Sequence, residues 1–274
     1  MVAMSSSLPE YASPPVIEVV CGVRFASIDQ FKAIHLGLLW ERLKNGFPNV
    51  EEQPPVAIAI EHLGKPSAQS PELQFVTQPP LPRVWFVDER GNGIIQVQRD
   101  TFLHNWRKLK PEDQYPRFRT VIASFKSYLE LFATFLEEHE LGKITPVQCE
   151  LTYVNHIPEG PIWSRDKSFG NLFPDFAWRE TPDRFLPIYE GLNWRTAYRL
   201  PERQGRLHVT KQLAFLQPSG DPIVALELKA RGIAGTALIS DIWPWFETAH
   251  EWIVRGFTDI TGEKAQKELW GRTR

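Results

Sequence analysis

Hydrophobic residues follow two different spacings along the chain, and these spacings predict where strands and helices form. Residues 16–25 (VIEVVCGVRF) alternate between two sets of side chains and are rich in β-branched residues, which predicts a strand. Apolar residues recur every three or four positions between 118 and 136, which predicts a long amphipathic helix from about Pro116 to Glu140. This helix is the strongest secondary-structure signal in the sequence.

The same two spacings predict the remaining elements. Two further helices are expected at about 29–45, with Asp29 as the N-cap, and at about 240–261, each followed by a glycine. The other expected strands lie at 56–62, 73–77, 83–88, 93–98, 147–156, 191–200, 206–216 and 223–231. Glycines in the turn at 89–93 supply the positive φ that a tight hairpin requires.

The order of these elements predicts an α+β fold, because the strands arrive as antiparallel hairpins and do not alternate singly with helices. We expect one or more antiparallel sheets with the long amphipathic helices packed on one face. A pattern of hairpin, strand and long helix occurs over 83–157 and again over 191–261, which raises the hypothesis of two similar lobes.

Residues 158–187 differ from the rest of the chain because they combine five prolines with many aromatic residues. The aromatic residues are Trp163, Phe169, Phe173, Phe176, Trp178 and Phe185. That much proline excludes a long helix or a central strand, so we expect an irregular segment packed over the body as a lid or an interface. It would join two lobes, about 16–157 and 188–274, of a single unit 16–274 that follows a flexible lead-in, 1–15.

Composition and charge limit the classes of function. The chain has 274 residues, of which 42% are hydrophobic and 23% charged, so it is long enough to bury a core. Its formal charge of −2 excludes nucleic-acid binding that is driven by bulk charge. The N-terminus lacks the pattern of a secretory signal, and no window approaches the roughly 18 apolar residues of a membrane span. We therefore expect a cytoplasmic protein without a membrane partner.

The two cysteines, Cys21 and Cys149, each lie in a predicted strand. We expect two buried, reduced thiols, since a disulfide would require the two strands to be neighbours. The chain contains no CxxC or Cys/His spacing, so the sequence predicts no structural zinc and no cofactor.

The predicted strands carry polar side chains on the face opposite their apolar residues. We call this set the polar face: Glu18, Arg24, Gln96, Gln98, Asp100, Gln148, Glu150, Thr152, His156, Arg206, His208, Thr210, Gln212, Glu227, Lys229 and Arg231. One interpretation is the solvated side of an antiparallel sheet. The other is a curled sheet whose polar groove binds a ligand or another chain, which the share of neutral Gln, Thr and His slightly favours.

Catalytic chemistry has few candidates. None of the seven histidines pairs with another histidine at metal-ligand spacing, and no Gly-x-Ser-x-Gly elbow is present. The weak candidates for a hydrolase-like site are Asp100, Glu150, His156 and His208, all on the polar face. A histidine beside a carboxylate could act there as a general acid–base pair. The alternative is that these histidines are solvated or satisfied in the core.

Tryptophans of the last helix suggest an interface. Trp243, Trp245 and Trp252 cannot all lie on its narrow apolar stripe, so at least one should be partly exposed. Because tryptophan is enriched at interface hot spots, this favours homodimerisation or docking of a partner, unless residues 158–187 cover the helix. Residues 99–109 mix basic and aromatic side chains, but one such strip in a neutral protein leaves nucleic acid a disfavoured partner.

Several motifs occur in a fixed order: 14–18, 96–100, 105–107, 115–117, 149–156, 205–208, 249–257 and 269–271. Together they resemble a sporadically distributed bacterial family of uncharacterised proteins of about this length. The resemblance spans nearly the whole chain and implies a single unit, but it brings no assigned activity or catalytic residue. Sporadic distribution implies an association with mobile or defence-related gene contexts.

The sequence therefore predicts a non-catalytic binding or regulatory protein that engages a protein or small-molecule partner through the polar face and the segment 158–187. The candidate binding residues are Glu18, Arg24, Gln96, Gln98, Arg206, Arg231, Trp163, Trp178, Trp243 and Trp252. The alternatives are a hydrolase-like enzyme that uses the Glu/His/Asp cluster and a homodimeric scaffold.

Overall fold

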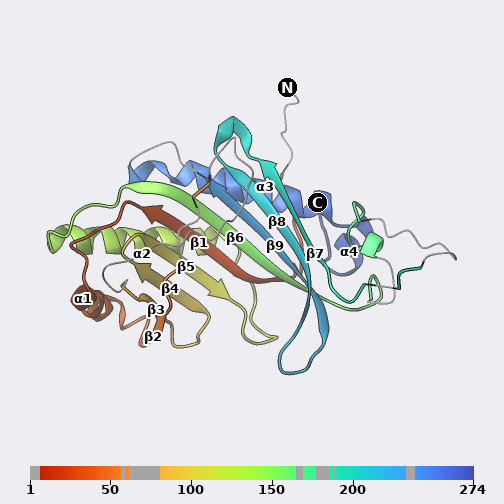
Figure 1. Ribbon diagram of the computed structural model, residues 1–274, viewed down its shortest axis with the longest axis horizontal. Helices are drawn as coiled ribbons and strands as arrows, with labels where there is room; N and C mark the ends of the chain where they lie inside the picture. Colours follow the sequence, from red (N-terminus) through yellow and green to blue (C-terminus); the bar gives the residue numbers. More distant parts are fainter. Residues whose placement is uncertain are drawn as a thin grey trace.

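A computed structural model describes residues 7–56, 60–61, 81–164, 169–176, 185–187, 189–232 and 238–274. All of the strands in these ranges belong to one antiparallel sheet (Figure 1). The strands are β1 (Val16–Phe25), β2 (Asn49–Gln53), β3 (Arg83–Val87), β4 (Gly93–Gln98), β5 (Thr101–Arg107), β6 (Pro146–Pro158), β7 (Asn193–Arg199), β8 (Arg206–Phe215) and β9 (Pro222–Gly232). The α-helices are α1 (Ala33–Leu43), α2 (Phe118–Glu138), α3 (Trp243–Ile260) and α4 (Glu263–Glu268), and short 3₁₀ helices occur at Phe169–Asn171, Pro201–Arg203 and Ile239–Asp241. The predicted α+β class is confirmed as one large antiparallel sheet with helices.

The strand order is β2-β3-β4-β5-β1-β6-β9-β8-β7, with β1 and β6 as neighbours near its centre. β1 is the first strand of the N-terminal half of the chain, and its outer neighbour, β5, is the last strand of that half. In the same way, β6 is the first strand of the C-terminal half, and its outer neighbour, β9, is the last. The strand order outward from β1 is β5, β4, β3 and β2, and the order outward from β6 is β9, β8 and β7. In each half the last strand therefore lies next to the central one, and the first half adds one more strand, β2, at its edge.

Both long helices contact the sheet through aromatic rings. Phe132 of α2 stacks on Phe102 of β5 with ring centroids 5.2 Å apart, and His250 of α3 stacks on Tyr153 of β6 at 6.0 Å. Phe102 and Tyr153 pair with residues of β1 that lie four positions apart. Because successive strand residues point to opposite faces, both rings lie on the same face, which we call the helix face.

Helix α1 begins later than the sequence predicts, and Asp29 is not its N-cap. The N-cap is Lys32, whose backbone N–H donates to Nδ1 of His35 at 2.8 Å. Asp29 instead accepts a hydrogen bond from Ser27 at 2.9 Å. An imidazole in the first turn thus satisfies one of the orphan N–H groups that a capping carboxylate would otherwise take.

One edge of the sheet also differs from the prediction. Residues 56, 60 and 61 form no strand, whereas β2 forms at 49–53 and pairs with β3. Most of β2 is exposed, so it has no apolar alternation to reveal it in the sequence. The predicted strand at 73–77 lies outside the described residues.

Cys21 and Cys149 lie on neighbouring strands, and both are free and fully buried, as the sequence predicts. Their register partners, Leu151 and Val23, place both thiols on the helix face. Burial raises the pKa of both thiols, to about 12 for Cys149, because a thiolate in the core loses its hydration. Among the described residues, no helix has both the length and the apolar character that crossing a membrane requires.

Candidate functional site

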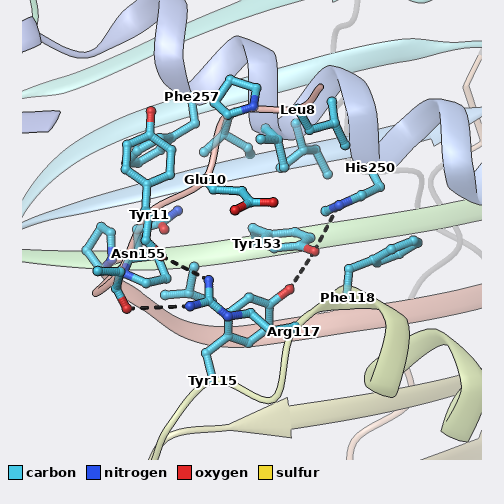
Figure 2. Close-up of a pocket in the computed structure, with 18 of the residues that line it drawn as sticks. Leu8, Glu10, Tyr11, Tyr115, Arg117, Phe118, Tyr153, Asn155, His250 and Phe257 are labelled. Atoms are coloured by element: carbon cyan, nitrogen blue, oxygen red, sulfur yellow. Dashed lines mark hydrogen bonds between the residues drawn. The ribbon is translucent and has the colours of Figure 1, made fainter. Parts of the chain in front are cut away.

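A cleft of about 780 Å³ lies on the helix face, between the start of α2 and the middle of α3 (Figure 2). Strands β6 and β9 contribute its floor, and the N-terminal residues 8–15, which we call the strap, form a third wall. Most of the surrounding side chains are apolar or aromatic. They include Leu8, Tyr11, Phe118, Leu228, Ile253 and Phe257. The cleft is therefore a concave and mostly apolar site between separate parts of the chain.

Three polar side chains form a hydrogen-bonded chain in this cleft. The hydroxyl oxygens of Tyr115 and Tyr153 lie 2.8 Å apart, and the Tyr153 hydroxyl lies 3.1 Å from Nδ1 of His250 (Figure 2). The imidazole lies flat against Phe118, with ring centroids 3.9 Å apart and an interplanar angle of 8°. The stacking fixes the plane of the imidazole, so its nitrogens have defined directions.

Local structure explains how each member reaches the cleft. Tyr153 pairs with the buried Val19 of β1, so the alternation of β6 points it to the helix face. Tyr115 lies just before the first turn of α2. His250 follows the buried Phe246 by four residues, which places both on the inner side of α3. A loop, a strand and a helix thus supply one residue each.

Burial keeps this chain uncharged at neutral pH. Loss of hydration raises the pKa of Tyr115 and raises that of Tyr153 well above its ordinary value, and the neighbouring Tyr115 raises it further. Loss of hydration also lowers the pKa of His250 to about 4, because burial costs the charged imidazolium more hydration energy than it costs the neutral ring. This chain of three side chains therefore offers the cleft hydrogen-bonding groups without formal charge.

Arg117 ties the cleft to the strap. It is the N-cap of α2 and has a φ of 70°, in the left-handed region that non-glycine residues rarely adopt. Its guanidinium donates to the carbonyl oxygens of Tyr11 at 3.0 Å and Ala12 at 3.5 Å. A strained backbone of this kind costs roughly 1–3 kcal/mol, and such residues cluster at functional sites.

The strap is also fastened to the C-terminal end of the chain. Tyr11 forms a β-bridge with Arg272, and its hydroxyl lies 2.8 Å from the hydroxyl of Thr258. Its ring is buried, with 7% of the residue exposed. Hydrogen bonds and a buried ring thus hold the strap, which belongs to the expected lead-in 1–15, against α3 and the C-terminus.

The strand residues predicted to form the polar face share one face of the sheet, opposite the cleft, whereas Asp100 lies in the turn between β4 and β5. Glu150 of β6 lies opposite Arg231 of β9, which lies opposite Arg206 of β8. In the next row, Lys229 lies opposite His208. Cross-strand partners point to the same side, so the register places these residues together.

Much of this polar face is buried and paired internally. Arg231 Nε lies 3.2 Å from Glu150 Oε2, and the carboxylate of Glu61 bridges Arg206 and His208, with His208 Nε2 at 2.7 Å. Burial alone would raise the pKa of Glu61, but hydrogen bonds from His208 and Arg206 lower it overall. Glu61 precedes β3 by a long stretch of sequence, and no sequence pattern indicated it.

The remaining binding candidates on this face are also engaged by the protein itself. Gln96 donates to Asn105 at 2.7 Å, and Arg24 donates to Thr101. The other side-chain bonds are Gln98 Nε2 to Val56 O and Asp100 Oδ1, and Asn105 Nδ2 to Glu18 Oε1. Since Arg24, Gln96 and Gln98 are buried, the interpretation of a solvated sheet face is wrong at its centre.

The four catalytic candidates do not form one constellation. Asp100 accepts from Gln98, Glu150 pairs with Arg231, and His208 pairs with Glu61. His156 lies six positions from Glu150 along β6, which corresponds to roughly 20 Å. Among the described residues, no hydrogen bond joins two of the four. The structure thus distributes them over separate local contacts.

Tryptophan positions divide into core and surface. Trp163 is fully buried and stacks on Phe169 with centroids 5.3 Å apart, so its ring packs in the core and offers no binding surface. Trp243 and Trp252 are half-buried, as expected for the flanks of α3, whereas Trp245 is buried. Trp178 lies outside the described residues.

Comparison of the chain with protein-family models finds no match, and comparison with curated proteins finds none either. The described residues also contain no group of three or more His, Cys, Asp or Glu that could hold a metal ion. Sequence reasoning missed the grouping of Tyr115, Tyr153 and His250. Each of them lies in a motif on which the family resemblance rests (115–117, 149–156 and 249–257), and this was the available signal.

Proposed function

We propose that this protein is a non-catalytic binding protein whose ligand is a small molecule held in the cleft between α2 and α3. The observation that carries the proposal is a cavity of about 780 Å³ whose walls are mostly apolar and which contains the hydrogen-bonded chain of Tyr115, Tyr153 and His250. Small-molecule sites typically have volumes of about 300–1,000 Å³ and combine apolar walls with a few placed polar groups. The cleft has both properties.

The chemistry of the polar chain supports binding over catalysis. A general acid or base works best when its pKa lies near the working pH. Burial moves the pKa values of Tyr115, Tyr153 and His250 away from neutrality, in the direction that keeps each group uncharged. Such groups orient a ligand through hydrogen bonds and do not readily exchange protons with it.

The strap supports a regulatory role for the same site. It forms one wall of the cleft and is held by Arg117 and by the C-terminal segment. A bound molecule would add contacts to the strap and so stabilise this closed arrangement of both chain ends. We also propose the finer fold description, in which both long helices cover one face of two similar lobes and the cleft lies beside their central strand pair.

A substitution that fills the cleft tests this function. Val254 lines the cleft on α3, so Val254→Trp should remove ligand space, and Val147→Trp on an exposed part of β6 is the matched control. A library of small apolar amides, alcohols and acids is screened by thermal shift, and binders are confirmed by native mass spectrometry. We expect binders that raise the melting temperature of the parent and the control but not of Val254→Trp. Binders that affect all three proteins equally, or a complete absence of binders, would contradict the proposal.

A further inference from the structure

The direction of the hydrogen bonds through the cleft couples its two ends. Tyr153 has a single hydroxyl proton, so it donates either to Tyr115 or to His250 but not to both. When it donates to Nδ1 of His250, the imidazole carries its proton on Nε2, and Tyr115 must donate to Tyr153. The Tyr115 oxygen is then an acceptor towards the cleft, while Nε2 is a donor.

The opposite direction reverses both ends. When Tyr153 donates to Tyr115, His250 must donate from Nδ1, so Nε2 becomes an acceptor. The Tyr115 proton then points away from Tyr153 and is a donor towards the cleft. In both arrangements one end of the chain donates and the other accepts, as long as the imidazole is neutral.

Both ends are open to a ligand. Tyr115 and His250 line the cleft, and within the described residues neither the Tyr115 hydroxyl nor His250 Nε2 has a further hydrogen-bond partner. The two ends lie at most about 8 Å apart along the chain. An amide spans that distance, because its oxygen and nitrogen lie about 2.3 Å apart and each hydrogen bond adds about 2.9 Å.

We infer that the cleft selects a neutral group with one donor and one acceptor, an amide or a lactam on an apolar body, over a carboxylate of the same shape. This inference rests on the proposed function, because it names the ligand class of the same cleft. A carboxylate offers two acceptors, so both chain ends would have to donate. That arrangement requires a proton on both nitrogens of His250.

The surroundings of His250 oppose such a proton. Its ring is stacked on Phe118, and the hydroxyl of Tyr153 is its hydrogen-bond partner. Three exposed charges line the same cleft, and all of them act through solvent. Arg117 and Arg119 weakly repel an imidazolium and weakly attract a carboxylate, while Glu10 on the strap does the opposite. From α3, the negative charge of Glu247 also acts on Tyr153. Burial remains the dominant effect and lowers the pKa of His250 to about 4.

Matched probes test the selectivity. We would measure binding of 4-phenylbutanamide and 4-phenylbutanoate to the full chain by calorimetry at pH 7. The amide should bind at least about tenfold more tightly, because one oxygen of the carboxylate then faces the accepting end of the chain and receives no hydrogen bond from it. In Tyr153→Phe the two ends are no longer coupled, so the preference should fall to about threefold or less. Tyr128→Phe, which removes a hydroxyl outside the cleft, should keep the full preference.

A second measurement covers the case in which Tyr153→Phe does not fold. Calorimetry in two buffers of different ionisation enthalpy counts the protons that accompany binding to the parent protein. We expect the carboxylate to take up close to one proton and the amide none. Carboxylate binding without proton uptake, or equal affinity for both probes, overturns the inference and leaves the proposed function standing. Absence of amide binding also overturns it, and the proposed function is then decided by the library screen with Val254→Trp.

Discussion

Protonation of His250 gives a direct measure of how completely the cleft is shielded from water. The pKa of this imidazole falls from 6.5 to about 4 on folding, chiefly because burial removes its hydration. The folded state therefore favours the neutral ring. Stability from this effect is fully present above pH 6.5 and is lost as the pH falls towards 4, because the unfolded chain binds a proton that the folded chain resists.

The magnitude follows from these two pKa values. Between pH 7 and pH 5, His250 should lower the free energy of unfolding by about 1.8 kcal/mol. The buried His104, whose pKa burial also lowers to about 4, should contribute a similar loss. The variant His250→Gln cannot titrate, and its amide oxygen can still accept from Tyr153. Its loss over the same pH interval should therefore be smaller than that of the parent by about 1.8 kcal/mol.

Urea unfolding followed by circular dichroism at pH 7 and pH 5 measures this difference. The matched control is the same substitution outside the cleft, His139→Gln at the exposed C-terminal end of α2. Comparing the change between the two pH values removes any constant effect of the substitution itself. If His250→Gln and the parent lose the same free energy, the imidazole is not shielded, and the reasoning about a neutral cleft is refuted.

Three further predictions concern other parts of the molecule. Glu150→Ala leaves the mostly buried Arg231 without its partner and should lower the free energy of unfolding by about 3 kcal/mol, measured by urea unfolding; a loss below about 1 kcal/mol would show the pair to be solvated. Cys21 and Cys149 should react with the thiol reagent DTNB at least about 100-fold more slowly in the native protein than in concentrated urea, and fast native reaction would contradict their burial. Arg117→Ala removes two hydrogen bonds to the strap and should speed proteolytic removal of the strap, seen by mass spectrometry; an unchanged rate would mean that the C-terminal contacts alone hold it.

The amino-acid sequence alone determined the elements with strong periodicity. Helix α2 and strand β1 follow from the 3.6 and 2.0 spacings of their apolar residues, which depend only on local backbone geometry. The same alternation separated polar from apolar residues on β1, β4, β6, β8 and β9. It could not show whether the polar residues meet water, because that depends on which other segments pack against them.

Only the tertiary structure decided which residues meet. Glu61 reaches Arg206 and His208 across more than 140 positions of sequence, and a contact at that separation leaves no local periodicity. Likewise Tyr115, Tyr153 and His250 come from a loop, a strand and a helix, whose apolar spacing would fit many pairings. Their shifted pKa values arise from burial, and burial exists only once the strands and helices have assembled around them.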